Sequence, residues 1–240
     1  MVGIGGGVPS EENDIRLGDV IVSQPVDSSG GVVQYDLGKT VEEGRFVRTG
    51  SLNRPPNILL SAVSSLQARH MVVDSELAKF LSEMQSRRPK LKAMTTCPSA
   101  DQDRLFEANY NHRAGEATCA RYEGDRLVTR SERSNKIPSI HYGLIASGNQ
   151  VMKDGVTRDN LRKELNMLCF EMEAAGLMDN FPCLVIRGIC DYSDTHKNDL
   201  WQPYAAAVAA AYAKELLGII PGIQTAFTRV EPSATTQSGE

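Results

Sequence analysis

The chain has 240 residues, and its 26 basic and 30 acidic side chains give a formal net charge of -4 at pH 7. Hydrophobic residues make up 41% of the sequence and charged residues 23%, and the mean hydropathy is -0.29. These values are typical of a folded globular protein, and they give no electrostatic reason to expect nucleic acid or an anionic membrane as a partner. The sequence has no apolar run of membrane-spanning length and no signal-peptide pattern, so we expect a cytoplasmic, intracellular protein.

The first half of the chain predicts strands followed by helices. The opening MVGIGGGVPS predicts the end of a buried strand and then a glycine run whose backbone comes close to another group. Residues 18–26 and 31–39 have strand composition and are separated by the turn DSSGG, so together they predict a β-hairpin. Apolar residues at helical spacing between 57 and 88 predict two helices.

The second half returns to buried strands. Residues 95–135 are polar and irregular and predict a long loop. Residues 139–148 predict a buried strand that ends in small residues, and 157–167 predict a short helix capped by Thr157. The run 183–191 predicts another buried strand, and the alanine-rich segment 199–218 predicts a helix.

Strands that alternate with helices, several of them continuous apolar runs, predict an α/β fold with a largely buried sheet. We expect one domain over residues 1–222 and a disordered tail or the start of a linker over 223–240. Ligands of such sheets lie beyond the carboxyl ends of the strands. The segments that place glycine or polar residues there are GIGGG, IASGNQ and RGICDYSD.

Common motifs for cofactors and metals are missing. GIGGGV has Val8 where a dinucleotide fingerprint needs Gly or Ala, and DLGKT has Val33 where a P-loop needs its first glycine. The five cysteines and four histidines are scattered, without the spacing of a zinc site. We therefore expect reduced thiols, no metal and no cofactor.

Three acidic residues are candidates for chemistry. Glu171 and Glu173 flank Met172 among apolar neighbours, and a carboxylate in such surroundings needs partners, for which sugar hydroxyls are suitable. Asp191 follows a buried strand, where a catalytic acid would be presented. A solvated turn and a solvated loop acid are equally compatible with these positions taken singly.

The pairing of EMEA with a later strand that ends in Arg-x-x-Cys-Asp resembles the purine nucleoside phosphorylase superfamily, which includes methylthioadenosine/S-adenosylhomocysteine nucleosidase. IHYGLIASGNQVMKD, CFEMEAAGLM and RGICDYSDTHKNDLWQPYAAAVAAAYAKELL resemble most closely the phosphorylase-like N-terminal domains of large fungal multidomain proteins. The resemblance covers most of residues 1–222 and implies a phosphorylase-type mixed central sheet flanked by helices.

The resemblance implies an enzyme that cleaves the N-glycosidic bond of a purine nucleoside or nucleotide. It makes Asp191 the acid that protonates the base, and it makes Arg187 a catalytic residue that orders the nucleophile. Glu173 would hold the ribose hydroxyls and Met172 would pack on the sugar. The backbone at Gly5 and Gly6 would approach the nucleoside. The other residues that the resemblance implies for substrate binding are Ser147, Gly148, Val151, Met152, Phe170 and Glu171.

Structural alternatives exist for several of these residues. The glycines fit a tight turn, Met172 fits a core position, and Arg187 fits a structural ion pair with Glu171. At the level of function, the resemblance leaves a second class open, a nucleoside-binding or regulatory module of a larger fungal signalling protein that has lost turnover.

Relatives carry a portion before the glycine run that supplies a water-activating glutamate or phosphate ligands, so we expect an N-terminally incomplete domain. Hydrolysis is slightly favoured over phosphorolysis because no phosphate clamp is visible, and phosphate is the single co-substrate to consider. The resemblance also implies a homo-oligomer and further domains after the tail.

Overall fold

The computed structural model describes residues 1–113, 119, 126–133, 135 and 137–220. The elements found there alternate between short strands and helices, with two 3-10 turns at Glu42–Gly44 and Ala100–Gln102. In chain order the strands and α-helices are β1 (Val2–Gly7), β2 (Val20–Ser23), β3 (Val32–Gln34), β4 (Gly38–Thr40), β5 (Phe46–Arg48), α1 (Asn57–His70), α2 (Leu77–Arg87), α3 (Pro89–Met94), β6 (Ile140–Ser147), α4 (Gly155–Leu165), β7 (Met167–Glu171), α5 (Ala174–Met178), β8 (Ile186–Asp191) and α6 (Gln202–Ile219).

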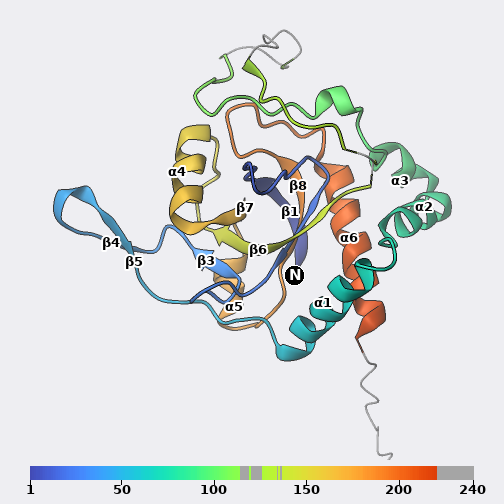
Figure 1. The fold of residues 1–240 in the computed structure, drawn as a ribbon, viewed down its shortest axis with the longest axis horizontal. Coiled ribbons are helices and arrows are strands. Elements are labelled where there is room, and N and C mark those ends of the chain that lie inside the picture. Colours follow the sequence, from blue (N-terminus) through green and yellow to red (C-terminus); the bar gives the residue numbers. More distant parts are fainter. Residues whose placement is uncertain (114–118, 120–125, 134, 136, 221–240) are drawn as a thin grey trace, which may run out of the picture.

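A six-stranded mixed sheet forms the centre of the fold, in the order β2-β8-β1-β7-β6-β3. Strand β1 runs parallel to β8 and antiparallel to β7. Strand β2 also pairs with β6, so five strands close on themselves and β3 lies outside the closed set. Helices α1, α2 and α6 lie on one side and α4 on the other (Figure 1). The predicted α/β fold with a mixed central sheet is therefore confirmed.

The core is divided by this sheet. The interior of the closed set holds apolar side chains such as Ile21, Ile145 and Ile189. A larger cluster outside it joins α1, α2 and α6 to β2 and β8. Small residues allow α6 to lie close, because a Cβ built at Gly188 would collide with the backbone of Ala205. The alanine-rich composition of α6 thus serves close packing on β8.

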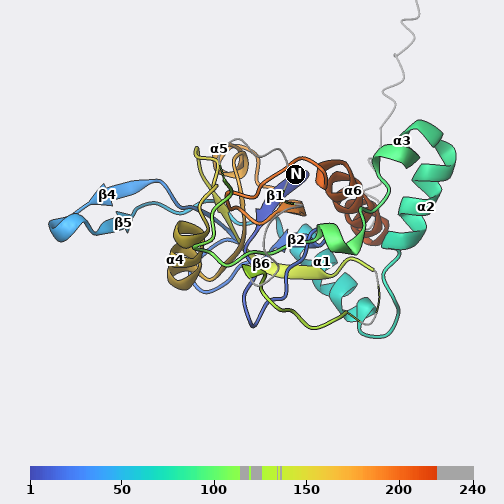
Figure 2. The ribbon, with the colours of Figure 1, turned by 90° about the horizontal axis from the view of Figure 1, so that it is seen from above.

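The predicted hairpin over 18–26 and 31–39 is wrong. Strands β2 and β3 run in the same direction, since both are parallel to β6. Strand β2 pairs with Ile140–Gly143 and β3 with Ile145–Ser147. The two strands therefore pair with successive halves of β6 and not with each other. The end of the second segment is β4, which pairs with β5 in a two-stranded arm that extends from the body (Figures 1 and 2).

The helix predicted over 157–167 is displaced. It runs from Gly155 to Leu165, and its N-terminus is capped by Asp154, whose carboxylate accepts from the Thr157 backbone N–H, so the prediction that Thr157 is the cap is wrong. Asn166 ends the helix in the left-handed conformation, with φ of 51°. Residues from Met167 onward form buried strand β7, which the sequence analysis did not predict.

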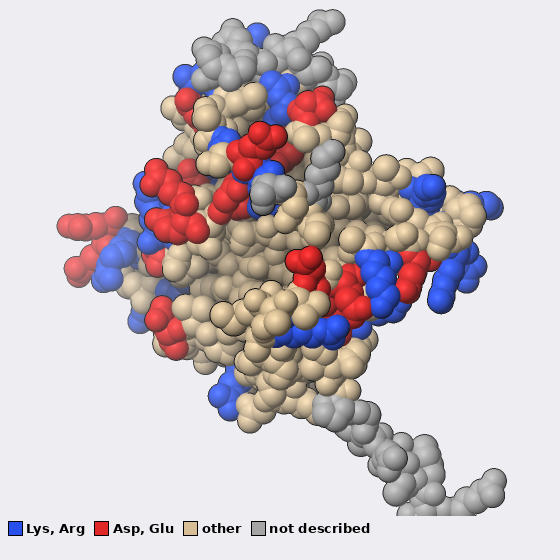
Figure 3. All heavy atoms as spheres, turned by 45° about the vertical axis from the view of Figure 1, so that its right-hand side comes forward, with Lys and Arg blue, Asp and Glu red and all other residues tan. Residues whose placement is uncertain are grey.

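The strands predicted over 139–148 and 183–191 are confirmed as β6 and β8, and the helix predicted over 199–218 is confirmed as α6. No helix among the described residues is both long enough and apolar enough to cross a membrane. Figure 3 shows acidic and basic side chains interspersed over one face of the molecule. The predicted tail, 223–240, lies outside the described residues.

The contact of α6 with β8 can be tested with Gly188→Ala. The new methyl group would meet the Ala205 backbone, which cannot rotate away as a side chain can. We expect the free energy of unfolding to fall by about 1–3 kcal/mol, the usual cost of overpacking, as measured by urea denaturation. Gly176→Ala in α5 is the matched control, because no atom lies within 4 Å of its Cβ position. Equal midpoints for the two variants would contradict the close packing.

Candidate functional site

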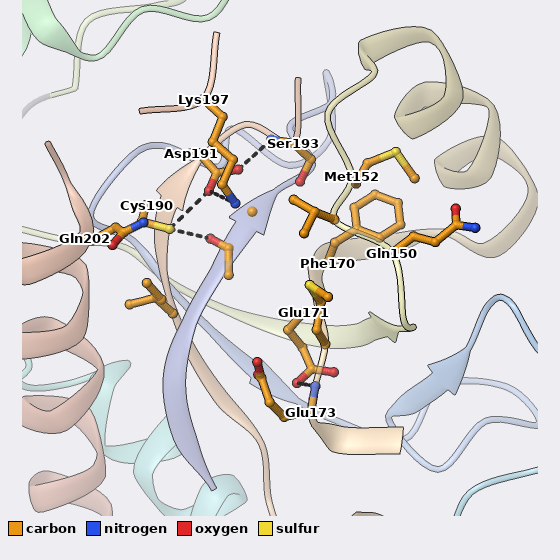
Figure 4. Close-up of a pocket in the computed structure, with 15 residues that line it drawn as sticks. Gln150, Met152, Phe170, Glu171, Glu173, Cys190, Asp191, Ser193, Lys197 and Gln202 are labelled. Atoms are coloured by element: carbon orange, nitrogen blue, oxygen red, sulfur yellow. Dashed lines mark hydrogen bonds and ion pairs between the residues drawn. The ribbon is translucent and has the colours of Figure 1, made fainter. Parts of the chain in front are cut away.

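One cavity lies alongside β1, between the end of β7 and the end of β8 (Figure 4). Strands β7 and β8 run in opposite directions because β1, which separates them, is parallel to β8 and antiparallel to β7. Their terminal carboxylates therefore approach the cavity from opposite directions. Its volume is about 150 Å³, and its walls are formed by Ile4, Gly5, Gly6, Gln150, Val151, Met152, Phe170, Glu171, Met172, Glu173, Cys190, Asp191, Ser193, Lys197 and Gln202.

Most of the residues predicted for the site line this cavity. The three that do not are Ser147, Gly148 and Arg187. The Ser147 hydroxyl is buried and accepts from the backbone N–H of Ala175 at 2.9 Å, so it fixes the start of α5. A Cβ at Gly148 would meet the ring of Tyr35. These two residues shape the walls from behind the cavity.

The glycine run is required by side chains of the protein itself. A Cβ at Gly3 would collide with the Arg187 guanidinium, and one at Gly5 would lie 2.8 Å from the backbone oxygen of Phe170. A Cβ at Gly6 would collide with Ser193 and lie 2.7 Å from Asp191 Oδ1. Because Gly5 and Gly6 also line the cavity, the run both admits neighbouring side chains and presents bare backbone to the cavity.

Glu171 and Glu173 have different surroundings. Glu171 has a fully buried side chain, accepts from the backbone N–H groups of residues 173 and 174, and forms an ion pair with Arg187. Glu173 has a side chain that is 58% exposed, and its carboxylate lies 2.9 Å from Arg187. The ion pair that the sequence left as an alternative for Arg187 is therefore present. Glu173 keeps carboxylate surface open to the cavity, whereas Glu171 is occupied by the protein.

Asp191 ends β8 and is held by three groups. Its Oδ1 accepts from the backbone N–H of Ser193 at 2.9 Å, and its Oδ2 lies 3.0 Å from Lys197 Nζ (Figure 4). The Cys190 thiol donates to Oδ2 at 3.2 Å, and burial raises the pKa of that thiol, so it stays protonated. The carboxylate is thus fixed at one end of the cavity, opposite Glu173.

The apolar wall lies between these charged ends. Phe170 is contacted edge-on by Tyr35, with ring centroids 5.2 Å apart, and Tyr35 donates to the backbone oxygen of Gln150. Val151 and Met152 line the cavity beside them. This wall presents apolar side chains between the two carboxylates.

Sequence reasoning missed several wall residues, among them Gln150, Ser193, Lys197 and Gln202. Ser193 and Lys197 follow Asp191 closely along the chain, and that proximity is the one signal that could have pointed to them. Gln202 enters from the start of α6. In the part of the chain that the structure describes, no group of three or more His, Cys, Asp or Glu side chains could hold a metal ion.

No family model matches the chain. It is 50% identical over 220 residues to a nucleotide-binding leucine-rich repeat (NLR)-like protein of Hyaloscypha variabilis, across 92% of this chain and 21% of that protein. It is 30% identical over 100 residues to the 5'-methylthioadenosine/S-adenosylhomocysteine nucleosidase of Mycobacterium bovis, across 40% of this chain and 39% of that protein. It is 26% identical over 225 residues to the ATP nucleosidase Cap17 of Escherichia coli, across 90% of this chain and 35% of that protein.

Among solved structures, the 5'-methylthioadenosine/S-adenosylhomocysteine nucleosidase of Neisseria meningitidis in complex with methylthio-immucillin-A aligns with a TM-score of 0.48 and 17% identity, over 90% of this chain and 67% of that one. The curated relatives confirm the resemblance that the motifs indicated: the chain is similar to proteins of the nucleoside phosphorylase and nucleosidase superfamily. It spans about a fifth of the NLR-like protein and less than half of each of the two nucleosidases.

The different surroundings of the two glutamates predict different effects of neutralising them. Glu171→Gln leaves buried Arg187 without its main partner, so we expect the free energy of unfolding to fall by on the order of 3 kcal/mol. Glu173→Gln is the matched control and should cost less than about 1 kcal/mol, because this half-exposed carboxylate is screened by water. Urea denaturation measures both. If Glu173→Gln lowered the free energy of unfolding more than Glu171→Gln, Glu173 and not Glu171 would be the main partner of Arg187.

Proposed function

We propose that the chain cleaves the N-glycosidic bond of a purine nucleoside or nucleotide and releases the base by hydrolysis. The observation that carries this proposal is the placement of Asp191 and Glu173 at opposite ends of one cavity. One end then offers a proton donor to the leaving base, and the other offers an acceptor for sugar hydroxyls. The similarity to two nucleosidases supports the same reaction.

The charges around the cavity support this reaction. Bond cleavage leaves positive charge on the sugar and negative charge on the departing base. Asp191 would donate a proton to the base, and the Glu173 carboxylate would accept from the ribose hydroxyls and stabilise the charge on the sugar. Met172, which is exposed at the cavity, would pack on the sugar, while Phe170 and Met152 would contact the base.

Charge distribution favours water over phosphate as the acceptor. Among the described residues that line the cavity, the single cation is Lys197, and it is paired with Asp191. Arg187 lies just outside and is paired with two glutamates. A phosphate ion would need a cation that is not already neutralised. The names of two relatives, both nucleosidases, point the same way.

A second candidate function is a nucleoside-binding module without turnover. The 50% identity to an NLR-like protein, of which the matched segment is about a fifth, favours a domain that serves a larger signalling protein. In that case the ribose contacts would be kept and base release would be absent. This second candidate function includes further domains in the parent protein and self-association of the chain.

The two candidates are separated by incubating the purified protein with adenosine, inosine, guanosine, 5'-methylthioadenosine and ATP, with and without phosphate. Free base is measured by chromatography. We expect base to be released without phosphate. Release that requires phosphate would show that the bond is cleaved by phosphorolysis and not by hydrolysis. Binding by calorimetry without release under either condition would favour the second candidate.

Asp191→Asn tests the acid directly. The amide keeps the shape of the side chain and has no acidic proton, so we expect kcat to fall by about 10²- to 10⁴-fold, the usual contribution of general acid catalysis. The dissociation constant for the nucleoside should change by less than about threefold. Asp74→Asn, on the exposed connection between α1 and α2, is the control and should leave both values unchanged. Undiminished base release in the Asp191 variant would remove Asp191 from the mechanism.

A further inference from the structure

A second, smaller cavity adjoins Asp191. It has a volume of about 50 Å³ and shares Cys190, Asp191 and Lys197 with the candidate site. We call the candidate site the front cavity and the smaller one the rear cavity. Because Asp191 and Lys197 line both cavities, this pair lies between the front cavity and the rear cavity.

The pair differs from an isolated carboxylic acid. Lys197 Nζ lies 3.0 Å from Asp191 Oδ2, and the two side chains are 27% and 3% exposed. Burial lowers the pKa of the Lys197 ammonium, but the adjacent Asp191 carboxylate outweighs this and raises the pKa above its usual value. At neutral pH Lys197 is therefore an ammonium, and it holds a proton 3.0 Å from the Asp191 side chain.

The proposed reaction takes one proton from the Asp191–Lys197 pair each time a base is released, and that proton has to be replaced. A base bound in the front cavity would also cover Asp191 on that side, so a proton arriving from solvent needs another route. The rear cavity adjoins both members of the pair, and most of the residues that line it do not line the front one.

The rear cavity is suited to hold water. Its volume exceeds the roughly 30 Å³ that a water molecule occupies in the liquid. Polar side chains line it, among them Gln102, Asp194, His196 and Asn198. Ordered water needs two to four polar partners, and these walls supply them.

We propose that Lys197 stores the proton that Asp191 gives to the base and that water in the rear cavity restores it; this rests on the proposed function. The proton passes from the Lys197 ammonium to Asp191, and from Asp191 to the base nitrogen. That nitrogen also takes the electron pair of the broken glycosidic bond. Lys197 becomes a neutral amine and regains a proton from the rear cavity, while the attacking water releases one to solvent.

Other titratable groups face the pair and are the same in every variant compared below. They lie on the segment from β8 to α6, on β7, and around the two cavities: Cys190, Asp194, His196, Asp199, Cys169, Arg104, Cys119, Glu171 and Glu173. A shift of the pH profile between variants therefore reports on Lys197.

Two substitutions separate proton storage from simple charge pairing. Lys197→Arg keeps the positive charge, but a guanidinium does not release a proton in proteins. We expect kcat to fall at least about 100-fold while KM changes by less than about threefold. Lys197→Met should lose kcat to a similar degree at pH 8 and recover toward pH 5, because a buried carboxylate without its ammonium partner takes up a proton as the pH falls.

The experiment measures kcat and KM for base release from pH 5 to 9 in the full chain. Lys163→Arg, on the exposed face of α4, is the control and should match the unmodified protein. Wild-type kcat in Lys197→Arg, or an unshifted pH profile in Lys197→Met, would overturn proton storage while the proposed function stands. No base release by the unmodified protein would overturn both. If Lys197→Met fails to fold, Lys197→Arg alone decides.

Discussion

The buried ion pair between Arg187 and Glu171 is the interaction on which the rest of the site depends. Arg187 lies on β8, Glu171 ends β7, and β1 runs between these strands, so the guanidinium must cross β1 to reach its partner. Glycine at position 3 leaves that path open. A buried arginine is stable when carboxylates and backbone groups satisfy both members of the pair. Glu171 also accepts from two backbone N–H groups at the start of α5, and Arg187 also donates to the backbone oxygen of Ile4.

The same arrangement divides the cavity into two charged ends. At one end Arg187 neutralises Glu171 and orients Glu173, which keeps its carboxylate at the surface of the cavity. At the other end Asp191 is fixed by a backbone N–H, a thiol and an ammonium. Strand β1 separates them and presents bare backbone at Gly5 and Gly6. Asp191 is the last residue of β8, and Glu173 lies two residues after β7 at the start of α5, so the closed sheet positions both ends.

Local patterns in the sequence were sufficient for part of this. The segments of β6 and β8 are continuous apolar runs, which are typical of strands in a buried sheet, so they were predicted as strands. Strand β7 was missed because it is a run of five residues directly after a helix, and a short apolar run fits either element. The hairpin failed for a related reason: β2 and β3 have strand composition, but composition carries no information on which strand each will pair with.

By itself, the sequence determined the α/β class, the resemblance to nucleosidases, and the residue types at the two charged ends, because these follow from local spacing and from motifs. The tertiary structure alone decided the partners. It assigned Arg187 to the glutamates, showed that the glycines make room for side chains of the protein, and brought Lys197 against Asp191. The reason is physical: strand order and the path of the segment after β8 arise from the packing of the whole chain, which no local stretch of sequence contains.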